Sequence, residues 1–350
     1  MKRYGNIFDK IVTLDNLRLA HKNARKNKSY YSEVKMVDEN LDYYLKQIQK
    51  MLVNKTFTTS NYEVFTIIDK EKEREIFKLP YFPDRIVQHA IMQQIEHVFL
   101  NHFIYDTYAA LPNKGIHVAL QRLDTFLKNK EEVTYCYKFD VKKFFPSVNK
   151  EILKSLIRKK FKDKDLLWLL DDIIDSCDEG LPIGNYTSQY FGNFYLSFLD
   201  HWLKEEKQVK FSGRYMDDVY ILHHDKNYLH KLRLEIENYL RVNLDLKIKE
   251  NWQVFPTFIR GIDFVGYRHF GDYILLRKNT ALKFKRKMRK ILKKCQNEKQ
   301  MTHSEWCSIN SYKGWLLWCN GYNLTKKYVE PLKHYAEKYY TEEVLKVEKL

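Results

Sequence analysis

Residues 211–224 read FSGRYMDDVYILHH, two short β-rich runs that meet at Asp217 and Asp218. Such runs around a polar pair are typical of a hairpin, so we expect two adjacent carboxylates at a hairpin tip. A third acid has a similar setting, because the apolar strand pattern of residues 133–149, VTYCYKFDVKKFFPSVN, stops at Asp140. Acids at strand ends are held rigidly, and they can converge in space although they are far apart in the sequence.

Three such acids predict a metal centre. Like charges at short range raise one another's pKa, so a cluster of Asp140, Asp217 and Asp218 requires cations to stay ionised. Two magnesium ions about 3.5–4 Å apart would neutralise the cluster and clamp the attacking and leaving oxygens of a phosphoryl transfer. The other acidic doublet, Asp171 and Asp172, lies in a helical pattern and predicts only a solvated turn.

The composition indicates a folded, basic protein. Of 350 residues, 61 are Lys or Arg and 45 are Asp or Glu, which leaves a formal charge of +16, and aromatic residues make up 15%. This balance favours a nucleic-acid partner over a merely soluble basic protein, and aromatic rings offer stacking faces for bases. The five cysteines form no C-x-x-C pair, which fits a cytoplasmic protein without a zinc site or disulfide framework. No apolar stretch is typical of a signal peptide or a membrane span.

Positive charge is concentrated near the C-terminus. Residues 277–294, RKNTALKFKRKMRKILKK, contain ten basic residues and no acidic one. A solvated helix face normally mixes charges of both signs, so this run favours contact with a nucleic-acid backbone. The residues expected to make that contact are Lys283, Lys285, Arg286, Arg289 and Lys290.

The order of the sequence blocks resembles the reverse transcriptase family. FDVKKFFPSV (139–148) is similar to motif A, GLPIGNYTSQYFGNFYL (180–196) to motif B and RYMDDVYIL (214–222) to motif C. KEREIFKLPYFPDRIVQHA (72–90) is similar to the fingers segment, and GIDFVGYRHF (261–270) to the primer grip. The resemblance implies an α+β right-hand polymerase fold. Fingers and palm would span residues 1–276, and a mostly helical, basic thumb would span residues 277–350.

The resemblance also implies catalytic roles. Asp140 and Asp217 would be metal ligands, and the Val141 carbonyl would be a further ligand. Asp218 would complete the acidic cluster and hold the primer-side metal less directly. Phe145 resembles the aromatic steric gate that would collide with a ribose 2′-hydroxyl. Its neighbour Phe144 is the alternative, because only one ring of the pair can face the site.

A second group of residues is expected to bind the incoming dNTP. Arg74 and Lys72 resemble the fingers residues that hold the triphosphate, although their mixed charge run also fits a solvated turn. Gln189 would lie by the template base or nucleotide with Ile183, and Gly184 would permit close backbone approach. Lysines 247 and 249 both follow motif C, and the sequence assigns neither as proton donor to pyrophosphate.

Within the family, the chain looks most like the enzymes of diversity-generating retroelements. IVQHA, KGIHVAL (114–120) and SYKGWLLWCNGYNL (311–324) carry that narrower similarity. It implies magnesium-dependent cDNA synthesis from a dedicated RNA template, with a DNA or RNA primer, errors concentrated at template adenines and a small accessory protein as a candidate partner. Two alternatives stay open: a defence-associated enzyme that copies a non-coding RNA against phage, and a maturase-like RNA-binding protein.

Overall fold

The computed structural model describes residues 3–69 and 72–347, with side chains for 3–68 and 73–341. The chain forms two compact units. Unit one comprises Met1–Asn113, Phe139–Val219 and His230–Trp252, and unit two comprises Lys114–Lys138, Tyr220–Leu229 and Gln253–Leu350. The two units are defined by compactness alone. The division into fingers and palm up to residue 276 and a thumb after it therefore stays a prediction.

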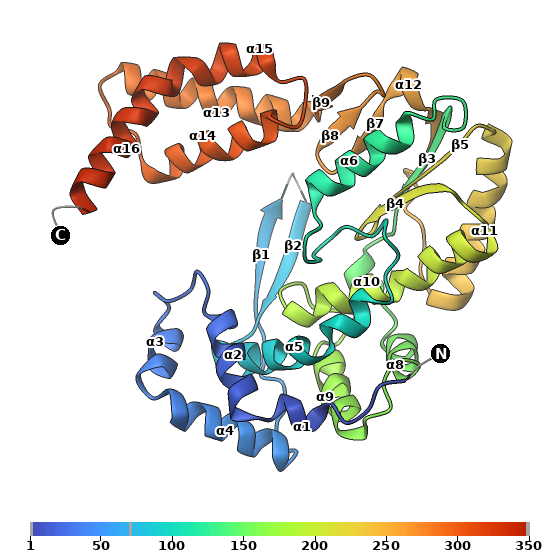
Figure 1. Ribbon diagram of the computed structural model, residues 1–350, viewed down its shortest axis with the longest axis vertical. Coiled ribbons are helices and arrows are strands. Elements are labelled where there is room, and N and C mark those ends of the chain that lie inside the picture. Colours follow the sequence, from blue (N-terminus) through green and yellow to red (C-terminus); the bar gives the residue numbers. More distant parts are fainter. Residues whose placement is uncertain (1–2, 70–71, 348–350) are drawn as a thin grey trace. The chain divides into compact units, whose positions relative to one another are not determined.

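The first part of unit one combines helices with one hairpin (Figure 1). Residues 61–80 contain two β-rich runs around a charged turn, which predicts a hairpin. The hairpin forms, and its strands pair antiparallel with Ile67 opposite Arg74. Buried Asn16 ties two helices together, because its amide donates to the carbonyls of Ile11 and Ala90 at 3.0 and 3.1 Å. The elements are α1 (Phe8–Ile11), α2 (Leu14–Ala24), α3 (Ser32–Glu39), α4 (Leu41–Val53), β1 (Glu63–Asp69), β2 (Lys72–Lys78), the π-helical turn η1 (Tyr81–Arg85) and α5 (Ile86–Leu100).

A four-stranded sheet carries the three acids singled out in the sequence. Its order is β4 (Phe211–Tyr215), β5 (Asp218–His223), β3 (Tyr135–Asp140) and β6 (Gln253–Pro256). The division between the units falls within β3 and β5, so the three acids all belong to unit one. The helices around these strands in the chain are α7 (Phe144–Ser147), α8 (Lys150–Arg158), α9 (Lys164–Asp175), α10 (Tyr186–His201), the turn η2 (Trp202–Glu206) and α11 (Lys226–Leu244).

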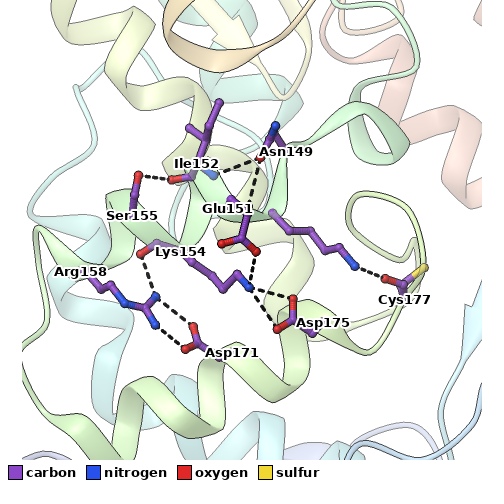
Figure 2. Close-up of polar contacts among 10 residues, drawn as sticks. Asn149, Glu151, Ile152, Lys154, Ser155, Arg158, Asp171, Asp175 and Cys177 are labelled. Atoms are coloured by element: carbon purple, nitrogen blue, oxygen red, sulfur yellow. Dashed lines mark hydrogen bonds and ion pairs between the residues drawn. The ribbon is translucent and has the colours of Figure 1, made fainter.

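The doublet Asp171 and Asp172 lies inside α9, as its helical pattern predicts, but both side chains are half-buried and not fully solvated. Both terminal nitrogens of Arg158 on α8 contact the Asp171 carboxylate (Figure 2). Asp172 accepts hydrogen bonds from the backbone N–H and the hydroxyl of Thr59, at 2.9 and 2.6 Å. The doublet therefore joins α9 to neighbouring segments, because each carboxylate has a partner on another part of the chain.

Unit two contains a small antiparallel sheet and a group of helices. Phe284, Met288, Ile291 and Cys295 recur at helical spacing on α13 and enter one apolar core with residues of the following helices. Figure 1 shows α13 and α14 side by side. The elements are α6 (Ile116–Leu127), α12 (Thr257–Arg260), β7 (Ile262–Phe264), β8 (Tyr267–His269), β9 (Ile274–Leu276), α13 (Lys278–Gln296), α14 (His303–Leu316), α15 (Tyr322–Leu324), the turns η3 (Thr325–Val329) and η4 (Glu330–Leu332), and α16 (Lys333–Val347). In the described part of the chain, no helix is both long and apolar enough to cross a membrane.

The loop before α10 approaches strand β2 closely at Gly184. The Phe77 N–H donates to the Ile183 carbonyl at 2.8 Å. Gly184 has φ +138°, and a Cβ there would lie 2.2 Å from the Phe77 carbonyl oxygen. Gly184 thus permits close backbone approach to β2, because a side chain would displace β2 or the loop. Close approach to a nucleotide stays a prediction.

We predict that Gly184→Ala lowers the free energy of unfolding by more than the strain of a positive φ, which is about 1–3 kcal/mol. Gly115→Ala is the matched control, because Gly115 has φ +129° but no atom within 4 Å of its added Cβ. Urea unfolding of both variants measures the difference. Equal losses in the two variants would show that the contact with Phe77 does not stabilise the protein.

Candidate active site

Backbone hydrogen bonds bring two of the predicted acids together. Asp140 is the last residue of β3, and Asp217 lies in the turn between β4 and β5. The Val141 N–H donates to the Asp217 carbonyl at 3.3 Å, which joins the end of β3 to this turn. The Lys249 N–H donates to the Asp140 carbonyl at 2.9 Å, so a third segment is fixed at the same place.

The turn that carries Asp217 has an unusual backbone conformation. Met216 has φ +56°, in the left-handed region that side chains other than glycine rarely adopt. Such a residue costs about 1–3 kcal/mol and persists where the surrounding structure determines it. The Met216 sulfur lies 3.6 Å from the position of a Cβ at Gly192 on α10, so a small residue leaves room for it there.

The electrostatics of Asp217 identify its neighbours. Burial raises the pKa of the Asp217 carboxyl, and the negative charge of Asp140 raises it further. Arg74 and Lys249 oppose this rise, so both cations lie close enough to stabilise the carboxylate. The structure therefore groups Arg74 of the hairpin with Asp140 and Asp217, and it adds Lys249.

The sequence left the choice between Lys247 and Lys249 open, and the structure distinguishes them. The Lys249 side chain is partly buried and acts on Asp217, whereas Lys247 is exposed and its carbonyl accepts from the Lys142 N–H at 2.8 Å. Residues i and i+2 of an extended segment face the same side, so strand alternation in LKIKENW could not have separated the two lysines.

The donor set suits a hard divalent cation. Asp140, Asp217 and the carbonyl of Val141 offer the oxygen ligands that magnesium prefers. A bound cation would also reverse the effects that raise the pKa of Asp217. Within the described residues, no three His, Cys, Asp or Glu side chains lie close enough to hold a metal by themselves. The backbone brings Asp140 and Asp217 together, and Asp218 begins β5 directly after Asp217, so its membership of the acidic cluster stays a prediction.

The aromatic pair after Asp140 divides into a buried ring and a partly exposed ring. Phe144 is 3% exposed, whereas Phe145 is partly exposed, and their ring centroids are 5.3 Å apart. The Phe145 ring also reaches within 3.5 Å of the Cβ position at Gly192 on α10. Phe145 is therefore the ring of the pair that is accessible beside α10, as a steric gate requires.

The other predicted nucleotide-binding residues lie on β2, on the loop before α10 and on α10 itself. Arg74 is exposed on β2, and Ile183 is half-buried in the loop, with its carbonyl bonded to β2. Gln189 is exposed in the first turn of α10. Lys72 begins β2, but its side chain lies outside the described residues.

The basic residues expected to contact nucleic acid lie on α13 in unit two. Lys283, Arg286 and Lys290 are exposed on the face opposite the apolar core, and Lys285 is half-buried. Arg289 differs from them, because it donates to the Tyr328 hydroxyl at 3.0 Å and lies over that ring. Arg289 thus has a packing role within unit two.

Comparisons with known proteins match this chain to a described family. Residues 68–269 match the model of the family "Reverse transcriptase (RNA-dependent DNA polymerase)". Protein YkfC of Escherichia coli (strain K12) is 24% identical over 215 residues, 58% of this chain and 50% of the relative. Nuclear intron maturase 4, mitochondrial, of Arabidopsis thaliana is 23% identical over 211 residues, 57% of this chain and 25% of the relative. The chain thus spans half or less of the length of these curated relatives.

One solved structure with a similar chain path is the apo telomerase of Candida tropicalis, truncated from its C-terminal domain. It has a TM-score of 0.47 and 14% identity, and the match covers 66% of this chain and 59% of that chain.

We predict that Asp217→Asn stabilises the metal-free protein near neutral pH. The raised pKa means that the ionised carboxylate is disfavoured in the folded state relative to the unfolded chain. The gain should be about 1.4 kcal/mol for each unit by which the pKa is raised. It should disappear as the pH falls below the unfolded value of about 3.9. Urea unfolding in a chelator between pH 4 and pH 8 measures it.

Asp163→Asn is the matched control, because the pKa of Asp163 is lowered and the expected change in stability has the opposite sign. Burial raises the pKa of Asp163, but hydrogen bonds from the N–H groups of Phe8, Ile7 and Leu166 outweigh burial and leave the pKa lowered. Asp163→Asn should therefore lower the free energy of unfolding at pH 7, and the loss should shrink toward acid pH. A destabilised Asp217→Asn at pH 7 would contradict the electrostatic argument.

Proposed function

Because the chain belongs to the reverse transcriptase family, whose model matches residues 68–269, we propose that it extends a primer 3′ end with dNTPs on an RNA template. This membership confirms the expected α+β polymerase fold class. The observation that carries the proposal is the grouping of Asp140 and Asp217 by backbone hydrogen bonds, beside Arg74 and Lys249. Two neighbouring carboxylates with cations beside them suit the binding of metal ions and a triphosphate.

Each residue of the group has a distinct task in this reaction. Asp140, Asp217 and the Val141 carbonyl would hold two magnesium ions, which supply positive charge for the 3′ oxygen and the transferred phosphoryl group. Asp218, at the start of β5, would complete the acidic cluster and hold the primer-side metal less directly. The Arg74 guanidinium would neutralise the triphosphate, and Lys249 is the better candidate for protonating pyrophosphate.

Selection of the nucleotide would depend on residues around the loop before α10 and on α10. The partly exposed ring of Phe145 would exclude a ribose 2′-hydroxyl, and Ile183 and Gln189 would contact the nucleotide or its template base. Lys72 would support Arg74 at the triphosphate. The backbone of the template and primer would contact α13 at Lys283, Lys285, Arg286 and Lys290. Arg289 would contribute less to this interface, because it already binds Tyr328.

The finer proposal is a diversity-generating retroelement enzyme that copies a dedicated RNA with errors at adenines, with a small accessory protein as partner. Two of the strings that carry this resemblance contact each other in unit two. His117 of KGIHVAL stacks on Trp318 of SYKGWLLWCNGYNL, with ring centroids 4.4 Å apart. The same block accepts a hydrogen bond from the Tyr267 hydroxyl at the Trp315 carbonyl, 3.0 Å away. These contacts support the proposal because they pack two of the strings that carry the resemblance into one region of unit two.

A second candidate function is that of a maturase-like RNA-binding protein. It is favoured by the similarity to a relative named as a nuclear intron maturase. A defence-associated enzyme that copies a non-coding RNA is a further alternative with the same polymerase chemistry. A primer-extension assay separates the maturase-like protein, which would be inactive, from the two polymerases. The pattern of copying errors then separates the retroelement enzyme from the defence-associated enzyme.

We predict that Asp140→Asn and Asp217→Asn each lower primer extension at least about 100-fold, because each removes a charged metal ligand. Binding of RNA should change by less than about twofold, since the basic residues of α13 are intact. Asp172→Asn is the matched control, because it removes one acid of the other doublet. Wild-type extension rates in the Asp217→Asn protein would refute the assignment, and an inactive but RNA-binding wild type would favour the maturase-like alternative.

We also predict that cDNA copied from a defined RNA carries substitutions concentrated at template adenines. Ile183→Ala should alter the error rate more than it alters RNA affinity, because selection against a mispair depends on contacts that a correct geometry completes. Sequencing of the products and filter binding of the RNA measure the two effects. Faithful copying of adenines, or errors spread evenly over all four template bases, would contradict the finer proposal.

A further inference from the structure

A buried arginine lies two residues before the turn that carries Asp217. Arg214 of β4 is 1% exposed, and its partner Asp200 near the end of α10 is 4% exposed. The Arg214 Nε lies 2.9 Å from both carboxylate oxygens of Asp200, and Nη2 lies 2.5 Å from Oδ2. Such a buried ion pair is kept by good geometry and by further hydrogen bonds, because desolvation of both charges is costly.

The remaining donors of Arg214 bind α10 and the turn itself. Nη1 donates to the Asn193 side-chain oxygen at 3.1 Å and to the Met216 carbonyl at 3.0 Å, and Nη2 donates to the Asn193 carbonyl at 3.2 Å. Met216 is the left-handed residue directly before Asp217. One guanidinium thus connects the strained turn to two separate positions on α10.

A second segment of chain surrounds the same pair. The Thr107 hydroxyl, which is fully buried, donates to Asp200 at 3.2 Å. The Arg214 N–H donates to the Asp106 carbonyl at 2.9 Å, and the Tyr108 N–H donates to the Arg214 carbonyl at 3.1 Å. The Asn193 amide donates to the Ala109 carbonyl at 2.8 Å. The side chain and the backbone of Arg214 are therefore both fixed, by partners that belong to unit one.

The planar guanidinium is necessary for this arrangement. It donates to the Asp200 carboxylate through two nitrogens and at the same time to the Met216 carbonyl through the third. A lysine at this position carries the same charge but a single nitrogen, which cannot reach the carboxylate and the turn together. A Lys replacement therefore tests the geometry separately from the charge.

We propose that Arg214 is a positioning residue for the catalytic turn, because it binds the Met216 carbonyl from the Asp200 ion pair and so fixes where Asp217 lies beside Asp140. This inference rests on the proposed polymerase function for its consequence in activity. The contact itself is independent of that function. The residue acts through the turn and does not touch the substrate.

The test compares Arg214→Lys and Thr107→Val with wild type in the full chain. Arg158→Lys is the matched control, because it weakens another Arg–Asp contact of unit one, that with Asp171 (Figure 2). Three quantities are measured well below the unfolding temperature of each variant. They are amide hydrogen exchange of residues 106–108 and 214–218, the primer-extension rate as a function of magnesium and dNTP concentration, and the affinity for the primer–template.

In Arg214→Lys we expect exchange at the turn to rise about tenfold and the maximal extension rate to fall at least about tenfold, since small displacements of a reacting group have effects of this size. The magnesium concentration for half-maximal rate should rise, while primer–template affinity changes by less than about twofold. Thr107→Val should show the same effects at a few-fold level, because it removes one hydrogen bond onto Asp200. Arg158→Lys should show none of them.

The proposal is overturned if Arg214→Lys lowers only the unfolding temperature and leaves turn exchange, maximal rate and magnesium dependence as in wild type. If Arg214→Lys does not fold, Thr107→Val decides by the same three measurements. If the wild-type chain extends no primer, the polymerase function fails, and hydrogen exchange alone decides. Unchanged exchange at residues 214–218 would then overturn the positioning role.

Discussion

The site depends on holding two carboxylates that repel each other at one place. Burial and the charge of Asp140 both disfavour an ionised Asp217, so side-chain attraction cannot bring the two acids together. The backbone does it instead, through the hydrogen bond from the Val141 N–H to the Asp217 carbonyl. The hairpin with Arg74 and the extended segment with Lys249 then supply positive charge from two further parts of the chain. The proposed metal-binding function would require the stability lost at this point.

The sequence predicts the local elements of this site well. The hairpin of residues 61–80, the strand that ends at Asp140 and the β runs around Asp217 all form, because their apolar patterns and turn residues act over short distances. The spacing of Phe284, Met288 and Ile291 likewise gives α13 its buried face. Family resemblance adds the order of the blocks, and the family match confirms the fold class.

Features that depend on register or on distant partners could not be predicted in the same way. The sequence could not show which of Lys247 and Lys249 lies near Asp217, because that depends on how residues 247–249 pair with the chain at the end of β3. The helical place of Asp171 and Asp172 was predictable, but their half-buried contacts were not, because the partners Arg158 and Thr59 are distant in the sequence. Arg214 carries no local signal for its role either, since Asp200, Asn193 and Thr107 reach it only in the folded chain. Whether Asp218 belongs to the acidic group is likewise a matter of three-dimensional placement.

The discontinuous composition of unit one affects how the chain folds during synthesis. Its three segments end at Asn113, Val219 and Trp252, so the unit cannot close before residue 252 has left the ribosome. At ordinary rates of translation, the 139 residues between positions 113 and 252 take roughly seven to thirty seconds to make. During that time α2 and α5 can already pack on each other, while α10 and strands β3, β4 and β5 are still being made. Until the last segment is made, the apolar residues of the first two segments cannot all be buried within unit one.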